Sequence, residues 1–164
     1  MVLFSLEKAI MGATKSHLWF EPILAGLVGY VLADLMIGVY HWGIDNYGSA
    51  LTPIFGSQID GFKRHHKWPW TITRIEFANP SQVVSLTVTF TVLPMVLASN
   101  DPIFHAFGAV CSSCIMFSLQ FHAWAHTTKS QLPPLVIALQ DMRLLVSPSK
   151  HANHHRLPYN NNYC

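Results

Sequence analysis

Histidines gather in a few short stretches of this chain, with the spacing of metal ligands. His122 and His126 are an i, i+4 pair, so on a helix both rings project from one face. A second stretch reads H-x-x-H-H, which places three imidazoles on one side of a single helical turn. A helix points the adjacent rings of a doublet apart, so each ring of "HH" in "GFKRHHKWPW" can serve a different ion. Imidazole suits zinc, copper and iron, so the ligand type alone leaves the metal open.

Two carboxylates have the spacing to join a histidine on one helical stripe. Asp34, His41 and Asp45 occupy positions i, i+7 and i+11. Metal-bound histidines usually donate their second N–H to an acceptor, and Asp45 is a candidate for that role or for a direct ligand. Asp34 lies inside an apolar run, where an ionisable side chain is a candidate functional residue. The alternative for Asp34 is a protonated or hydrogen-bonded packing residue.

The segments that must position these residues are apolar enough to cross a bilayer. The chain has 164 residues, of which 51% are hydrophobic and 11% are charged, whereas soluble domains carry about 25% charged residues. A spanning helix needs about 20 mainly apolar residues, and the segments 18–42, 77–100 and 102–128 satisfy this. The shorter run 132–146 contains Asp141 and Arg143, which favours an interfacial or re-entrant helix. We predict an all-α membrane protein with about three transmembrane helices plus interfacial or re-entrant helices.

Alternating spans place most basic residues on one side of the membrane. The loop 43–79 and everything after about residue 126 share one face, which is the cytoplasmic face or its organellar equivalent because lysine and arginine concentrate there. The other face receives only Lys8 and Lys15. The basic residues of the first face are Lys63, Arg64, Lys67, Arg74, Lys129, Arg143, Lys150 and Arg156.

The histidines follow the same division. His17 and His105 fall on the opposite side, and His105 is about 25 Å from His122 along the same predicted helix, so both are excluded from the cluster. The remaining histidines suggest two ions, with coordination positions left for oxygen or water. We predict a histidine-rich di-metal site on one face, with these metal ligands: His41, His65, His66, His122, His126, His151, His154 and His155.

A nitrogen-rich pair of metals at a membrane surface suits the oxidation of an apolar chain. Removing hydrogen from an unactivated methylene needs a stronger oxidant than any side chain, and iron with dioxygen can supply it. A metal transporter would instead place histidines at mid-membrane along a path. A di-haem cytochrome would need histidines paired between helices at two depths. The net charge of +2 is too small to indicate binding of nucleic acid.

Four motifs, in order along the chain, resemble the lipid desaturase family. They are "HWGIDNYGS", "GFKRHHKWPWTITRIEFANP", "QFHAWAHTTKSQLPPLVIALQDM" and "KHANHHRLPYNNNYC". The family includes the plasmanylethanolamine desaturases and a plant plastid desaturase that acts on phosphatidylglycerol. The plant branch is the more similar, through "HHKWPWTITR", "FHAWAH", "LPPLVIALQDM" and "PYNNNYC", and the resemblance covers about residues 34–164.

The resemblance implies an O2-dependent di-iron desaturase with two Fe ions and no catalytic side chain beyond the metal site. The same eight histidines would be its ligands. The implied reaction introduces a trans double bond at carbon 3 of palmitate esterified in phosphatidylglycerol. Ferredoxin would supply electrons in a plastid, and cytochrome b5 elsewhere. The alternatives are a desaturase or hydroxylase of another lipid, such as plasmanylethanolamine, and a non-catalytic metal-binding membrane paralogue.

The resemblance also implies a location and a domain organisation. The protein would be an integral multi-pass protein of a plastid membrane with its histidine face toward the stroma, although no transit peptide is visible. Residues 1–17 would form an N-terminal segment, and residues 18–164 a single lipid desaturase domain. Because the family continues beyond "NNNYC", this domain is expected to be shortened at its C-terminus.

Basic residues surround the histidine doublet. Lys63, Arg64, Lys67 and Arg74 could hold an anionic phosphate beside the metals, which makes them candidate headgroup-binding residues. The alternative is the ordinary bias of lysine and arginine toward that face of the membrane.

Overall fold

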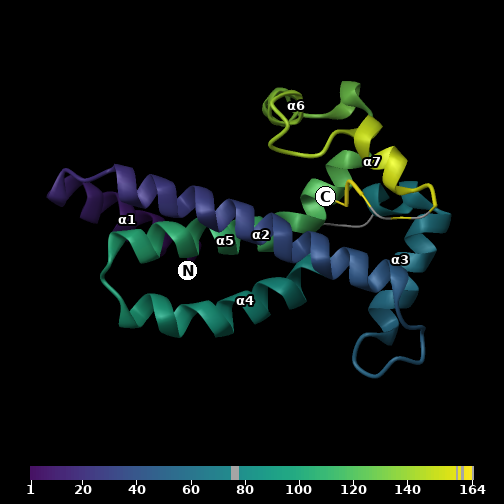
Figure 1. Cartoon of the computed structure of the whole chain (residues 1–164), viewed down its shortest axis with the longest axis horizontal. Helices are drawn as coiled ribbons and strands as arrows, with labels where there is room; N and C mark the ends of the chain where they lie inside the picture. Colours follow the sequence, from purple (N-terminus) through teal and green to yellow (C-terminus); the bar gives the residue numbers. More distant parts are fainter. Residues whose placement is uncertain (75–77, 158, 160, 164) are drawn as a thin grey trace. The chain divides into compact units, whose positions relative to one another are not determined.

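The computed structural model describes residues 1–74, 78–157, 159 and 161–163, and these form helices and no strand. The all-α prediction is therefore confirmed (Figure 1). The elements in chain order are α1 (Val2–Ser16), α2 (Phe20–Asn46), α3 (Gly56–Lys67), the 3-10 helix η1 (Pro69–Arg74), α4 (Ala78–Ala98), α5 (Pro102–Ala125), the 3-10 helix η2 (Lys129–Gln131), α6 (Pro134–Asp141) and α7 (Pro148–His154).

Two of these helices, α2 and α5, are long and apolar enough to cross a membrane. The predicted span 77–100 corresponds to α4, whose described apolar part is the shorter stretch Val84–Ala98. The helix continues through Pro94. Pro102 begins α5, where a missing backbone N–H leaves no helical hydrogen bond unmade. The run predicted to be interfacial or re-entrant contains α6, and its place in the membrane stays a prediction.

The chain divides into two compact units, each made of two stretches. Unit 1 comprises Met1–Met36 and Ala78–Phe117, and unit 2 comprises Ile37–Phe77 and Ser118–Cys164. All eight histidines predicted to be ligands belong to unit 2, while His17 and His105 belong to unit 1. The division also follows the predicted partition of lysine and arginine, since unit 1 holds only Lys8 and Lys15. The proposed boundary at residue 17 stays a prediction.

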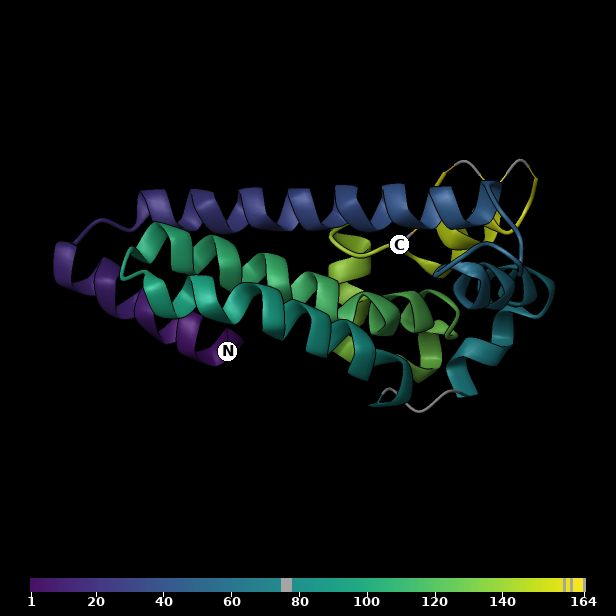
Figure 2. The ribbon, with the colours of Figure 1, turned by 90° about the horizontal axis from the view of Figure 1, so that it is seen from below.

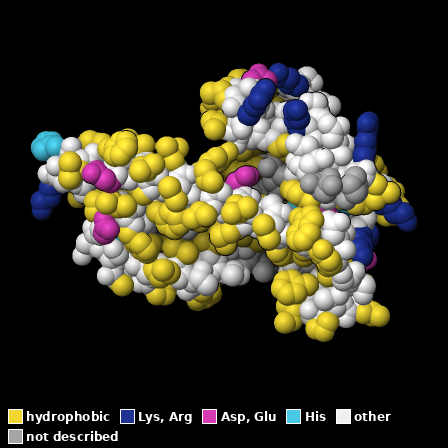
Figure 3. Space-filling view, viewed as in Figure 1, with side chains coloured by type: hydrophobic (Ala, Val, Ile, Leu, Met, Phe, Trp, Pro, Cys, Tyr) yellow, Lys and Arg dark blue, Asp and Glu magenta, His cyan; other side chains and the backbone are white. Residues whose placement is uncertain are grey.

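Unit 1 brings its helices close together at glycine. A Cβ on Gly29 of α2 would lie 2.7 Å from the backbone oxygen of Phe107 in α5, so only glycine fits without a shift. Figure 2 shows these two helices side by side. Apolar side chains of unit 1 remain exposed, among them Leu27, Val31 and Leu35, and hydrophobic atoms cover most of the face of this unit that Figure 3 shows. Such a surface suits contact with lipid rather than water.

His105 has a structural role in unit 1. Its side chain is fully buried, and its Nε2 lies 2.9 Å from the carbonyl oxygen of Ser99, to which it donates a hydrogen bond. The ring of Phe4 approaches it edge-on, with 6.5 Å between the ring centroids. These contacts account for a buried histidine without a metal.

Replacing Gly29 by alanine should destabilise the protein, whereas the same change at Gly38 should not. The new Cβ at Gly29 would collide with the backbone of α5, and overpacking of this kind costs about 1–3 kcal/mol. A Cβ on Gly38 meets nothing within 4 Å, so Gly38→Ala keeps only the gain in helix propensity. Denaturant unfolding of both variants in detergent measures the difference, and equal stabilities would contradict the close approach.

Candidate metal centre

Unit 2 presents its histidines from the ends of four helices. His41 lies one turn before the end of α2, and the doublet lies in the last turn of α3. His122 belongs to the last turn of α5, and His126 directly follows that helix. The short helix α7 carries His151 and His154, with His155 at its C-cap. The H-x-x-H-H pattern therefore forms a helical turn, as its spacing predicts.

Five of the histidines form one group, called here the five-histidine group: His65, His122, His126, His151 and His155. Their ligand atoms all lie within 4.8 Å of one another. The Nε2 atom of His122 is 2.8 Å from Nε2 of His65 and 3.3 Å from Nε2 of His126. The Nε2 atoms of His151 and His155 are 3.2 Å apart. The rings thus turn the same type of nitrogen toward one shared space.

The donor set of this group fits a metal ion better than it fits a hydrogen-bond network. An imidazole Nε2 carries either one hydrogen or one lone pair, so it satisfies one neighbour at a time. His122 faces two other nitrogens at contact distance. A cation among the rings would accept the lone pairs of all of them, and imidazole suits several first-row transition metals.

The electrostatics of the five-histidine group also favour a cation over protons. Burial and the charges of neighbouring histidines lower the pKa of His65 and of His126 to about 3. Burial lowers the pKa of His151 to about 4, although its bond to the Asn162 carbonyl acts in the opposite direction. At neutral pH these imidazoles are uncharged and keep the lone pairs that a metal needs.

The other ligands form a second group, called here the aspartate group: His41, Asp45, His66 and His154. Asp45 is its centre, since its side chain is only 1% exposed and touches three rings. Its Oδ1 lies 3.0 Å from Nε2 of His66, and its Oδ2 lies 3.3 Å from Nε2 of His41 and 3.2 Å from Nε2 of His154. A buried carboxylate needs compensating positive charge, and a metal held by the same residues would supply it.

The histidine doublet divides between the two groups. His65 belongs to the five-histidine group and His66 to the aspartate group, which is the arrangement that two ions require. Asp45 contacts the Nε2 atoms of all three histidines in its group. It could therefore bind an ion directly or accept hydrogen bonds from the histidines, the two roles predicted for it. Asp34 belongs to unit 1 and is part of neither group.

The four candidate headgroup residues are exposed and have partners within unit 2. Nζ of Lys63 donates to the carbonyl oxygen of Gly48 at 2.9 Å, and Arg64 pairs with Asp60 at 3.4 Å. Lys67 lies over the ring of Trp68, and Arg74 over the ring of Trp70. They lie along the second half of α3 and at the end of η1, each with a different partner.

Aromatic side chains that the sequence analysis did not single out enclose the aspartate group. The ring of Phe62 meets His41 edge-on, with 4.8 Å between centroids. Tyr163 lies 4.8 Å from His154 and 5.4 Å from His41, and Tyr159 lies 4.4 Å from His66. Both tyrosines belong to "PYNNNYC", one of the four motifs that resemble the plant branch of the family, and this resemblance was the available signal for them.

Comparison with known proteins identifies the family of this chain. The lipid desaturase domain matches residues 30–164, which include every member of both groups. The chain belongs to the lipid desaturase family. It is 63% identical over 160 residues to Fatty acid desaturase 4, chloroplastic, of Arabidopsis thaliana, a match that covers 98% of this chain and 50% of that protein.

More distant members of the lipid desaturase family match as well. The plasmanylethanolamine desaturase of Myxococcus xanthus is 33% identical, over 98% of this chain and 59% of its own length. Plasmanylethanolamine desaturase 1 of Mus musculus is 31% identical, over 87% of this chain and 56% of its own length. The chain therefore spans about half the length of the curated relatives it matches. No solved structure matches it.

The metal-free protein should lose stability as the pH falls below about 6.5. The folded pKa values of His65, His126 and His151 lie well below the ordinary 6.5, so between these values the unfolded chain binds more protons than the folded one. Stability is then fully present above about pH 6.5 and declines as the pH falls toward about 3. Thermal unfolding of chelator-treated protein over this range measures the effect, and a melting temperature that rose with acid would contradict it.

Replacing Asp45 by asparagine should weaken metal binding. The substitution keeps the shape of the side chain but removes the charge that faces three imidazoles, and such changes lower metal affinity by about 10–100-fold. Chelator competition, with metal content measured by mass spectrometry, provides the readout. Asp60→Asn is the matched control, because Asp60 lies in α3 of the same unit and is solvent-exposed. Equal metal affinity in the two variants would rule out a role for the Asp45 charge.

Proposed function

We propose that this chain carries the catalytic site of a membrane fatty acid desaturase. Its reaction introduces a trans double bond at carbon 3 of palmitate esterified in phosphatidylglycerol. The observation that carries the proposal is the pair of adjacent ligand groups, which together hold eight imidazoles and one carboxylate within unit 2. The 63% identity to a plant protein named as a chloroplastic fatty acid desaturase supports the choice of reaction.

The two groups would hold two iron ions. The five-histidine group supplies nitrogen ligands alone, and the aspartate group supplies three imidazoles and a carboxylate oxygen. When bound, iron with dioxygen provides an oxidant strong enough to remove hydrogen from an unactivated methylene. Overall, an adjacent pair of methylenes would lose two hydrogens and dioxygen would be reduced to two water molecules, with two further electrons from ferredoxin and two protons from solvent.

The chain's own residues prepare this chemistry. The lowered pKa values of His65, His126 and His151 keep their lone pairs available at neutral pH. Asp45 would offset the positive charge of an ion held by His41, His66 and His154. The rings of Phe62, Tyr159 and Tyr163 cover the aspartate group and limit the access of water to it. Excluding water protects a reactive oxidant from side reactions.

The basic residues near the histidine doublet would recognise the lipid headgroup. Lys63, Arg64, Lys67 and Arg74 are exposed along the second half of α3 and at the end of η1, where an anionic phosphate can replace or join their present partners. Phosphatidylglycerol carries one such phosphate and a net negative charge. A plastid membrane, with the histidines facing the stroma, is the location that fits a ferredoxin donor and the chloroplastic names of the plant relatives.

An ether phospholipid is the second candidate substrate. The bacterial and mouse relatives named plasmanylethanolamine desaturase share 33% and 31% identity with this chain, which is about half its identity to the plant protein. The plant likeness therefore favours phosphatidylglycerol.

Expression of the full chain in a host that lacks trans-3 hexadecenoate tests the proposal directly. We expect this acyl group to appear on phosphatidylglycerol and to disappear in His66→Ala, because His66 contributes to the aspartate group. His17→Asn is the control, since His17 is an exposed helix C-cap in the left-handed region, which asparagine tolerates.

Lipid profiling also separates the alternatives. A vinyl ether in place of the trans acyl group would move the proposal to the ether lipid. Purified protein without bound iron, or product that persisted in His66→Ala, would contradict the proposed function.

A further inference from the structure

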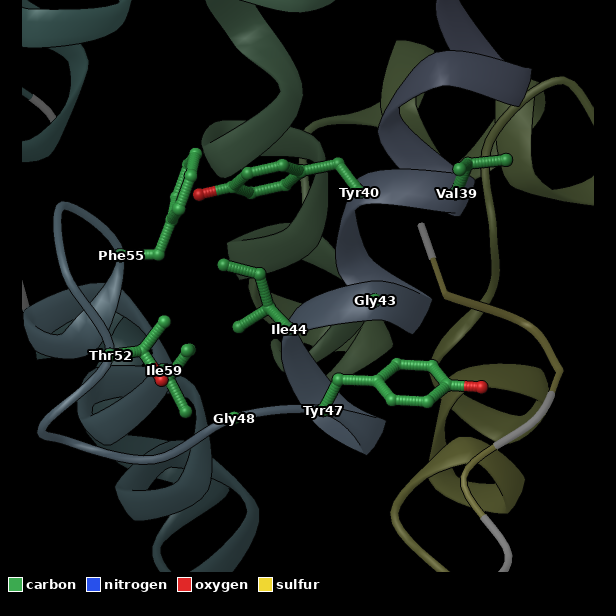
Figure 4. A pocket seen from close by; sticks show the side chains of 9 residues that line it. All are labelled: Val39, Tyr40, Gly43, Ile44, Tyr47, Gly48, Thr52, Phe55 and Ile59. Atoms are coloured by element: carbon green, nitrogen blue, oxygen red, sulfur yellow. The ribbon is translucent and has the colours of Figure 1, made fainter.

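An apolar pocket of about 300 Å³ lies in unit 2, on the side of α2 near the following loop (Figure 4). Ligand pockets typically occupy about 300–1,000 Å³, so this one can receive part of a ligand rather than a whole lipid. The end of α2, the loop 47–55 and the first half of α3 contribute its walls. Aromatic and aliphatic side chains dominate the lining: Val39, Tyr40, Ile44, Tyr47, Phe55 and Ile59.

Two polar side chains of the wall, Tyr40 and Thr52, are already hydrogen-bonded. The hydroxyl of Tyr40 donates to Oε1 of Gln58. The hydroxyl oxygen of Thr52 accepts the backbone N–H of Ser49 at 2.9 Å. A polar ligand would have to break these bonds, whereas a hydrocarbon chain needs none of them. The pocket therefore favours an alkyl segment.

The loop beside the pocket is exposed, apolar and strained. Leu51 and Ile54 are 91% and 88% exposed, although both side chains are large and hydrophobic. Ile54 has a φ of 68°, a conformation that costs a β-branched residue free energy and often marks a functional site. An apolar loop of this kind suits contact with lipid, from which an alkyl chain could enter.

A cation stands next to the pocket. Nζ of Lys63 lies 2.9 Å from the carbonyl oxygen of Gly48, and Gly48 is itself a lining residue. Lys63 is exposed, so its ammonium group can also meet a phosphate in solvent. An apolar pocket with an ammonium beside it matches an amphiphile that joins an alkyl chain to an anionic head.

The pocket and the metal ligands use different faces of α2. His41 and Asp45 point into the aspartate group, while Tyr40, Ile44 and Tyr47 line the pocket. The ring of Phe62 contacts both sides, with centroid distances of 6.3 Å to Tyr40 and 4.8 Å to His41. None of the metal ligands lines the pocket, so the segment held there is not the methylene pair that is oxidised.

We propose that this pocket binds an unreacted alkyl segment of an anionic phospholipid whose head lies at Lys63. The proposal rests on the proposed function for the nature of the lipid, but lipid binding at the pocket can be measured without any turnover.

Gly43 offers a way to fill the pocket without disturbing the fold. It lines the pocket, and a Cβ added to it meets nothing within 4 Å. Gly61 is the matched control. It is also helical, and a Cβ added to it also meets nothing within 4 Å, but it does not line the pocket. Gly43→Leu and Gly61→Leu thus add the same side chain to the same unit, one at a residue that lines the pocket and the other at a residue that does not.

The experiment uses phosphatidylglycerol with a diazirine near the methyl end of one acyl chain, incorporated with the full chain into lipid nanodiscs. After irradiation, we expect crosslinks to concentrate on Tyr47, Phe55 and Ile59. Gly43→Leu should lower them roughly tenfold, because the leucine side chain would take up part of the pocket, and Gly61→Leu should not. Bound iron should be equal in both variants, which separates a blocked pocket from a damaged metal centre.

The outcomes decide between the two proposals. Crosslinks spread evenly over exposed apolar faces, or unchanged by Gly43→Leu, would overturn the pocket assignment. An equal yield with diazirine-labelled phosphatidylcholine would overturn the role of the anionic head. If the crosslinks depend on Gly43 but no trans-3 product forms, the pocket assignment stands and the proposed function fails.

Discussion

The burial of many ligating groups in one small space is the constraint on which the rest of unit 2 depends. Eight imidazoles and one carboxylate lie in two groups, and within each group the ligand atoms are within 4.8 Å of one another. Protons are a poor solution, because each charged imidazole would repel its neighbours in a site of low polarity. A divalent cation held by these residues would neutralise Asp45 and accept the lone pairs of the rings together. The ends of α2, α3, α5 and α7 together supply the ligating groups of such a site.

Much of this arrangement could be predicted from helical periodicity and alternating membrane crossings. The i, i+4 spacing of His122 and His126 and the pattern at His151 place these rings correctly, because both stretches are helical or directly follow a helix. The separation of His65 from His66 follows from the angle of about 100° between successive residues of a helix. Periodicity also joined Asp34 to His41 on one stripe, but a stripe seven residues long extends beyond a compact site, and Asp34 belongs to unit 1.

The remaining features depend on tertiary contacts that have no local pattern. Phe62 lies three residues before His65, yet its ring meets His41 of another helix. The apolar pocket arises because Gly48 allows the loop after α2 to approach α3: a Cβ there would lie 2.8 Å from Cδ1 of Ile59, and its φ is 79°. Neither contact follows from spacing along one helix. The helix α2 thus places candidate metal ligands and pocket-lining residues on different faces, which its nearly uniform hydrophobicity conceals in the sequence.

The segment after α7 shows how a stretch without helical pattern can complete a metal site. Nδ1–H of His151 donates to the carbonyl oxygen of Asn162 at 2.9 Å, which fixes the tautomer whose Nε2 keeps a lone pair toward the five-histidine group. Asn162 has a φ of 51°, which asparagine adopts more readily than most residues. Tyr159 has a φ of 54°, a strained conformation for a bulky residue, and its ring packs on His66. Because one short segment touches both groups, its strained backbone is explained by the site that it encloses rather than by any need of the chain to turn there.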